Sequence, residues 1–269
     1  MASRSSGSES GSFWYGLSVQ ANVIGALIMR ELHTRYGRDN IGYLWMIGEP
    51  LILASLVALY HRGSHNHFGS DIRGVPFAII GYCIFVIFRG VMARAEGTLE
   101  ANMPLLYHRM VSIFDMLLAR AILEVASLMM TIIVLLSAAV AFGFAGWPVR
   151  PLYLIAAILL MGWFSFALSM IVCAVTHNNT IAAKFIHPFI YLMFPLSGAF
   201  YQLEWLPEPY RTWMSWYPMT LIFEAARYGQ FSSAKDTYID MSYIIGSCMV
   251  LTYIGLVAIK IVRRHVHLR

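Results

Sequence analysis

Apolar residues gather in six long blocks along the chain, and shorter polar segments separate them. Each block is close to the length that a helix needs to cross the hydrocarbon core of a bilayer, about 20 residues. Backbone groups in lipid must bond within their own segment, and the strands of a membrane barrel would alternate in polarity, so the blocks are expected to be helices. The predicted spans cover residues 41–61, 75–92, 113–144, 152–176, 181–200 and 243–261.

The segment before the first span, residues 21–38, has the pattern of an amphipathic helix. Apolar side chains recur every four residues from Ile24 to Tyr36, the arginines occupy other faces, and Gly37 is suited to end the helix. Such a helix is expected to lie along the cytoplasmic interface, and the alternative is a plain basic lead-in to the first span. Its candidate interface residues are Arg30, Arg35, Tyr36 and Arg38.

A second unusual segment, residues 203–229, lies between the fifth and sixth spans and is rich in Trp and Tyr. Aromatic side chains favour the membrane interface, and Pro218 forbids one continuous helix. We therefore predict two short periplasmic half-helices that dip into the outer leaflet, the second near residues 221–227. A loop lying on the surface is the alternative.

The composition agrees with a membrane protein, since 59% of the residues are hydrophobic and 12% are charged. A soluble domain carries about a quarter charged residues, so this chain has too few for a water-facing surface. With the N-terminus inside, about two thirds of the 19 Lys and Arg residues fall on the cytoplasmic side, as the positive-inside rule requires. Both termini are therefore predicted to be cytoplasmic.

The predicted fold is an all-α integral membrane protein with six transmembrane helices, an N-terminal interface helix and the two half-helices. Residues 1–18 are rich in Ser and Gly and lack the apolar core of a signal peptide, so they are predicted to be a disordered tail. Residues 19–269 are predicted to form one transmembrane domain. Cys83, Cys173 and Cys248 fall within apolar blocks and are expected to be buried thiols.

Several strings resemble the permease subunits of ABC-2-type capsular polysaccharide exporters. They are RELHTRYGRDNIGYLWMIGEP at residues 30–50, LEANMPLLYHRMVSIFDMLLARAILE at 99–124, MFPLSG at 193–198 and WYPMTLIFEAARYG at 216–229. The similarity runs from near residue 20 to the C-terminus and leaves out residues 1–18.

This resemblance implies a transport subunit of the bacterial inner membrane, a homodimer that binds two copies of a separate cytoplasmic ATPase. It also implies a lipid-linked polysaccharide as substrate and a periplasmic adaptor or co-polymerase as partner, besides membrane lipids and without nucleic acid. ATP and Mg are expected on the ATPase, because no lysine here follows the glycine that a phosphate-binding loop requires. No cofactor, metal or catalytic residue is expected in this chain.

Other classes of protein compete with this interpretation. Permeases for O-antigen, teichoic acid or another lipid-linked glycan share the topology. A membrane-embedded transferase would need a catalytic group, yet the HExxH and GxSxG motifs are absent. A secondary transporter or channel would lead us to expect inverted repeats, and the two halves of the chain show none.

The connection between the second and third spans is the candidate for energy coupling. The matching region of the exporter family is the coupling helix that docks on the ATPase, and our topology places it in the cytoplasm. Pro104 breaks the chain there, and residues 105–110 can form one short helix. Simple packing of its apolar side chains on the membrane surface is the alternative. The candidate coupling residues are Asn102, Leu105, Leu106, Tyr107, Arg109 and Asp115.

A translocation path is hypothesised along the first, second and fifth spans. In the fifth span, aromatic residues from position 187 to 201 recur at helical spacing, and flat rings pack well against the C–H faces of sugars. Packing between helices is the competing explanation for this face. The candidate path residues are Tyr43, Trp45, Glu49, Arg89, His187, Tyr191, Phe194 and Tyr201.

Two further groups of polar residues have structural explanations. Arg120 and Glu124 are four residues apart on one helix face, so they are expected to pair with each other. His61, His65 and His67 cluster in the first outer loop, but no convincing further ligand completes a metal site, and a solvated polar loop is favoured.

Overall fold

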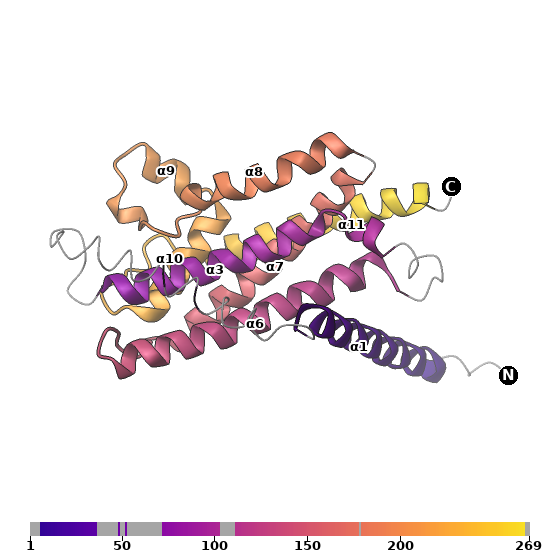
Figure 1. Ribbon diagram of the computed structural model, residues 1–269, viewed down its shortest axis with the longest axis horizontal. Coiled ribbons are helices and arrows are strands. Elements are labelled where there is room, and N and C mark those ends of the chain that lie inside the picture. Colours follow the sequence, from indigo (N-terminus) through magenta and orange to yellow (C-terminus); the bar gives the residue numbers. More distant parts are fainter. Residues whose placement is uncertain are drawn as a thin grey trace.

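Four long apolar helices make the body of the protein. They are α3 (Gly74–Ala95), α6 (Ile113–Ala141), α7 (Pro151–Thr176) and α11 (Met241–Val266), which run lengthwise through the bundle in Figure 1. Among the described residues, these are the helices long and apolar enough to cross a membrane. The computed structural model describes residues 6–36, 48, 52, 72–102, 111–177 and 179–266.

Helices α3 and α7 lie at the centre of the bundle. Most side chains of α3 are buried and none is fully exposed, and α7 packs against α3, α6 and α11. Small residues permit the close packing, since a Cβ at Gly255 of α11 would lie 2.8 Å from the Cβ of Met170 on α7. The outer faces of α6 and α11 expose large apolar side chains such as Met130 and Tyr253, as a helix that faces lipid does.

A shorter apolar helix, α8 (Thr180–Leu196), occupies the position of the fifth predicted span. It ends at Leu196 rather than at residue 200, because the chain turns at Gly198, whose φ of 88° is in the left-handed region that favours glycine. Helices thus occupy the positions of the second to the sixth predicted span. The first, residues 41–61, lies outside the described residues apart from positions 48 and 52, so the six-span count remains a prediction.

Helix α1 (Ser6–Tyr36) corresponds to the predicted interface helix but begins much earlier. Residues 6–18 are helical rather than disordered, which corrects our prediction for that part of the tail. Extending an existing helix costs far less than nucleating one, so even Ser and Gly can continue it. Leu27 is buried, with Ile24 and Ile28 packed beside it, so the predicted apolar stripe faces the bundle. The position of α1 at a membrane surface stays a prediction.

Two short helices follow α8, at the places where half-helices were predicted. They are α9 (Tyr210–Ser215), preceded by the 3₁₀ turn Leu203–Trp205, and α10 (Pro218–Gln230), which begins at the proline expected to break the segment. Helix α9 exposes Trp213, whereas almost all of α10 is buried against α3, α7 and α11. A surface loop is therefore excluded for α10.

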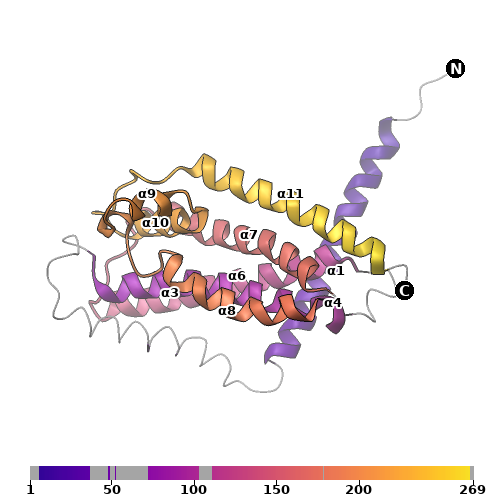
Figure 2. The same ribbon diagram turned by 90° about the horizontal axis from the view of Figure 1, so that it is seen from above.

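The bundle has two chemically different ends. Helices α9 and α10 gather at one, which we call the α10 end (Figure 2). The short helix α4 (Thr98–Ala101), α1 and the C-terminal end of α11 gather at the other, which we call the α4 end. The long helices run from one end to the other, so the assignment of these ends to the two sides predicted from the basic residues stays a prediction.

Candidate functional site

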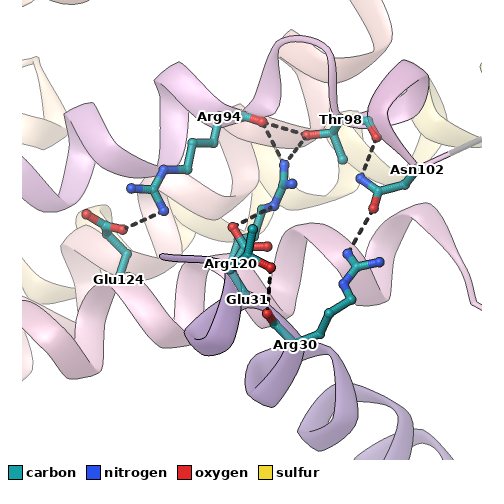
Figure 3. A network of polar contacts seen from close by, with 8 residues as sticks. Arg30, Glu31, Arg94, Thr98, Asn102, Arg120 and Glu124 are labelled. Carbon is teal, nitrogen blue, oxygen red and sulfur yellow. Dashed lines mark hydrogen bonds and ion pairs between the residues drawn. The ribbon is translucent and has the colours of Figure 1, made fainter. Parts of the chain in front are cut away.

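Two neighbouring residues of α1 bind two different elements at the α4 end. Arg30 Nη2 donates a 2.8 Å hydrogen bond to Asn102 Oδ1, just beyond α4. Glu31 Oε1 lies 3.6 Å from Arg120 Nε on α6. Asn102 is buried, and its amide also donates to the Thr98 carbonyl at 2.9 Å. Figure 3 shows that these contacts form one continuous network across α1, α4 and α6.

Arg120 is the centre of this network. Its Nη1 donates to Thr98 Oγ1 at 2.8 Å and to the Arg94 carbonyl at 3.0 Å. The same carbonyl accepts the Thr98 hydroxyl at 2.6 Å. Carbonyls in the last turn of a helix lack intrahelical donors, so a guanidinium is a suitable partner for the end of α3. Arg120 therefore joins α6 to the end of α3, to α4 and to α1 (Figure 3).

Glu124 pairs with Arg94 rather than with Arg120, so the predicted pair within α6 is wrong. Arg94 Nη1 of α3 lies 3.5 Å from Glu124 Oε2, and the Glu124 side chain is almost fully buried. A pair at i and i+4 adds only about 0.2–0.5 kcal/mol, whereas the end of α3 offers Arg120 a helix-terminal carbonyl and a hydroxyl. Gly90 makes room for the interhelical pair, because a Cβ there would overlap the Glu124 carboxylate.

Asp115, one of the candidate coupling residues, is buried and caps the first turn of α6. Ser112 Oγ accepts from the Asp115 amide at 3.1 Å, and Asp115 Oδ2 accepts from the Ser112 amide at 3.2 Å. Gln20 of α1 donates to Asp115 Oδ1 at 2.9 Å. Segment 103–110 is thus flanked on both sides by residues bonded to α1. The remaining predicted coupling residues, Leu105, Leu106, Tyr107 and Arg109, lie outside the described residues.

The aromatic residues predicted to line a path along the fifth span do not share one face in the structure. Phe194 turns into the bundle, with its ring centroid 4.4 Å from that of Phe85 and 4.8 Å from that of Phe200. Tyr191 is 65% exposed on the outer side of α8. Tyr201 lies beyond the end of α8, where its hydroxyl donates to the Leu196 carbonyl at 3.0 Å. Pro188 and Pro195 within the helix explain why the spacing does not produce one face.

The polar members of the predicted path are less informative. His187 Nε2 lies 3.8 Å from Glu96 Oε2 at the α4 end, and the guanidinium carbon of Arg89 lies 5.9 Å from the Tyr82 ring centroid. Tyr43, Trp45 and Glu49 lie outside the described residues, as do the side chains of Arg35, Tyr36 and Arg38 and the loop with His61, His65 and His67. All three cysteines lie within the described part of the chain and are buried and free of disulfides.

The sequence analysis missed a buried ion pair at the α10 end. Arg227 Nη1 lies 3.1 Å from Glu224 Oε1, one turn earlier on α10, and also donates to the Tyr201 carbonyl, while Nη2 donates to the Gly198 carbonyl. Its guanidinium carbon lies 4.4 Å from the ring centroid of Phe77 on α3. Glu224 accepts from the Leu203 amide at 3.0 Å. The pair fixes the turn after α8 to α10. The sequence feature that could have predicted it is two opposite charges three residues apart in an otherwise apolar segment.

An apolar groove of about 780 Å³ lies between α8 and α11, and residues of α7 also line it. Its lining includes Phe164, Met193 and Leu251, with the hydroxyl of Tyr217 near one end. The Tyr217 hydroxyl donates to Met193 Sδ at 3.4 Å. A groove of this chemistry suits hydrocarbon and not an ion. Among the described residues, no group of three His, Cys, Asp or Glu side chains could hold a metal.

Long apolar helices, a lipid-facing exterior and a polar network at one end define the class of this protein, a multi-pass α-helical integral membrane protein. The chain belongs to the ABC-2 type transporter family, which it matches over residues 22–231. The resemblance noted from the sequence is thereby confirmed.

Relatives within this family are similar over nearly the whole chain. Capsule polysaccharide export inner-membrane protein CtrC of Neisseria meningitidis serogroup B is 37% identical over 249 residues, which cover 93% of this chain and 94% of the relative. Protein BexB of Haemophilus influenzae, with the same description, is 34% identical over 248 residues, 92% and 94% of the two chains. Polysialic acid transport protein KpsM of Escherichia coli is 26% identical over 246 residues, 90% and 93%.

Proposed function

We propose that this chain is the membrane-spanning subunit of an ATP-driven exporter that moves lipid-linked capsular polysaccharide across the bacterial inner membrane. One observation carries the proposal, namely the similarity over more than nine tenths of the chain to proteins described as capsule polysaccharide export inner-membrane proteins. Permeases for O-antigen or teichoic acid are the alternative, and a membrane-embedded transferase is disfavoured by the same similarity.

The full assembly that we propose contains two copies of this chain and two copies of a cytoplasmic ATPase, which binds ATP and Mg. A periplasmic adaptor or co-polymerase receives the polymer on the other side. Each copy has six spans, the first within residues 41–61, and both termini lie in the cytoplasm. The location of α1, α4 and the C-terminal end of α11 at the same end of the bundle (Figures 1 and 2) supports this topology, because all three are then on one side of the membrane.

The α4 end is the proposed receiver of energy. No phosphate-binding loop occurs in the sequence, so movement must reach the spans by protein contact. Segment 103–110 continues directly from α4 and leads into the capped start of α6, so a push on it acts on both helices. The α10 end, in contrast, is proposed to stay rigid during transport, and the buried ion pair of Arg227 and Glu224 supports this role.

Deletion of the gene in its own encapsulated host tests the proposal. We expect polymer of normal chain length to accumulate inside the cells and to disappear from the surface, as measured on extracted and surface-labelled polysaccharide. Expression of the full chain should restore surface polymer. Loss of total polymer, without internal accumulation, would instead indicate a transferase, and loss of a different surface glycan would indicate another exporter class.

A further inference from the structure

We propose that Arg120 is the positioning residue through which α1 controls the α4 end of the spans, and that it does so by exchanging carboxylate partners. The inference rests on the proposed function, since it assigns a role in coupling ATP hydrolysis to transport. It concerns Arg120 together with Glu31, Arg94 and Glu124, the four charged residues that meet in Figure 3.

The first argument is the convergence of four helices on one side chain. Arg120 belongs to α6, contacts Glu31 of α1, and donates both to Thr98 of α4 and to the Arg94 carbonyl of α3. Only a guanidinium offers enough donors in a fixed plane to serve these partners together. A change in the position of Arg120 therefore changes α3, α4 and α6 at once.

The second argument is the unequal strength of the two contacts that α1 makes. Arg30 to Asn102 is an ordinary hydrogen bond of 2.8 Å, whereas Glu31 to Arg120 is a longer ion pair of 3.6 Å. Both side chains of the ion pair are less than one fifth exposed, so the attraction is only partly screened. Glu31 thus attracts Arg120 across the gap between α1 and α6, and a displacement of α1 lengthens this contact first.

The third argument is that a second carboxylate that could pair with Arg120 lies one helical turn away on α6. Glu124 is four residues after Arg120 on α6, the spacing at which side chains of a helix meet. In this structure Glu124 pairs with Arg94 of α3, and the Arg94 side chain is 37% exposed. Withdrawal of Glu31 leaves Arg120 free to turn to Glu124, which in turn releases Arg94. The exchange replaces the interhelical pair of Arg94 and Glu124 with a pair inside α6, and it loosens α3 from α6.

The position of α1 explains how a partner protein could drive this exchange. Gln20 binds Asp115 at the start of α6, and Arg30 binds Asn102 at the end of α4. Both flanks of segment 103–110 are therefore attached to α1, and an ATPase that moves the segment also moves the helix. Coupling of this kind is a free energy shared between two sites.

The test uses the full chain assembled with its ATPase and compares ATP hydrolysed with polymer exported. Glu31→Gln keeps the size of the side chain and removes the charge that holds Arg120. We expect the ATP hydrolysed per exported polymer to rise about fivefold or more, the lower range of allosteric coupling, with an unchanged melting temperature of the solubilised complex. Arg120→Lys, which keeps the charge but not the fork of donors, should show an intermediate rise.

Lys235→Gln is the matched control, because it removes an exposed ion pair with Glu204, 3.1 Å away, in the segment between α10 and α11. It should leave the ratio unchanged. An unchanged ratio in Glu31→Gln, or equal losses of hydrolysis and export, would overturn the role of Arg120. Failure of the unaltered chain to support export would instead refute the proposed function, so the two failures are distinguishable.

Discussion

Arg94 of α3 forms an ion pair with Glu124 of α6, at 3.5 Å, across a point where α3 carries only the hydrogen of Gly90. The glycine is what lets the carboxylate lie against the neighbouring helix. This interhelical pair replaces the pair within α6 that the sequence favoured. It leaves Arg120 available for α1 and for the end of α3.

Gly90→Ala should separate α3 from α6 at this point. Its methyl group would overlap the Glu124 carboxylate, so either the ion pair or the helix spacing must give way, at a cost of about 1–3 kcal/mol. The melting temperature of the solubilised protein should fall accordingly. Gly25→Ala on α1 is the control, because a Cβ there meets nothing within 4 Å, and it should be neutral or slightly stabilising. Equal melting temperatures for the two variants would contradict the packing described.

Removal of Arg227 should be more damaging than removal of both members of its pair. Arg227→Met leaves the buried Glu224 carboxylate without its cation and frees two carbonyls, which we expect to cost about 3–5 kcal/mol. Arg227→Met combined with Glu224→Leu should recover part of that loss. Thermal unfolding of the purified variants measures both, and strictly additive effects would show that the two side chains do not interact.

The long helices were predictable because an apolar run of spanning length is a local property of the sequence. The break at Pro218 and the apolar stripe of α1 were predictable for the same reason, although α10 is longer at both ends than the predicted helix near residues 221–227. The partners of Arg120 were not, because they depend on which helices become neighbours. Nor was the division of the aromatic face of α8, since two internal prolines and the turn at Gly198 redirect its side chains.

Phe194 and Tyr191 should respond differently to truncation. Phe194→Ala removes a ring packed against Phe85 and Phe200, so we expect a loss of about 2–4 kcal/mol in stability. Tyr191→Ala removes an exposed ring and should leave stability nearly unchanged. If Tyr191 lines the proposed path, polymer export falls while the melting temperature and ATPase binding stay the same. Normal export in Tyr191→Ala would exclude this residue from the path.

The proposed topology can be measured with single cysteines, because the three native thiols are buried and give little background. Ser18→Cys and Glu100→Cys are exposed positions near the α4 end, and Thr237→Cys is exposed between α10 and α11. In intact spheroplasts an impermeant thiol reagent should label only the cysteine at 237. Permeabilised cells should be labelled at all three. Labelling of position 100 in intact spheroplasts would refute the cytoplasmic location of the α4 end.

Arg109 is the residue through which we expect the ATPase to bind the α4 end. It lies in the segment flanked by Asn102 and Asp115, both of which are held by α1, so a force applied there passes directly to α1, α3 and α6. Arg109→Glu reverses a charge in a predicted docking surface and should weaken co-purification of the ATPase by about tenfold or more, since like charges placed together at an interface cost several kcal/mol. Arg109→Lys keeps the charge and should bind nearly normally.

Both variants should reach the membrane in normal amounts, because the charged surface of a cytoplasmic segment contributes little to helix packing. Normal ATPase binding and export by Arg109→Glu would place the docking surface elsewhere, and a loss of the protein from the membrane would assign the residue to folding.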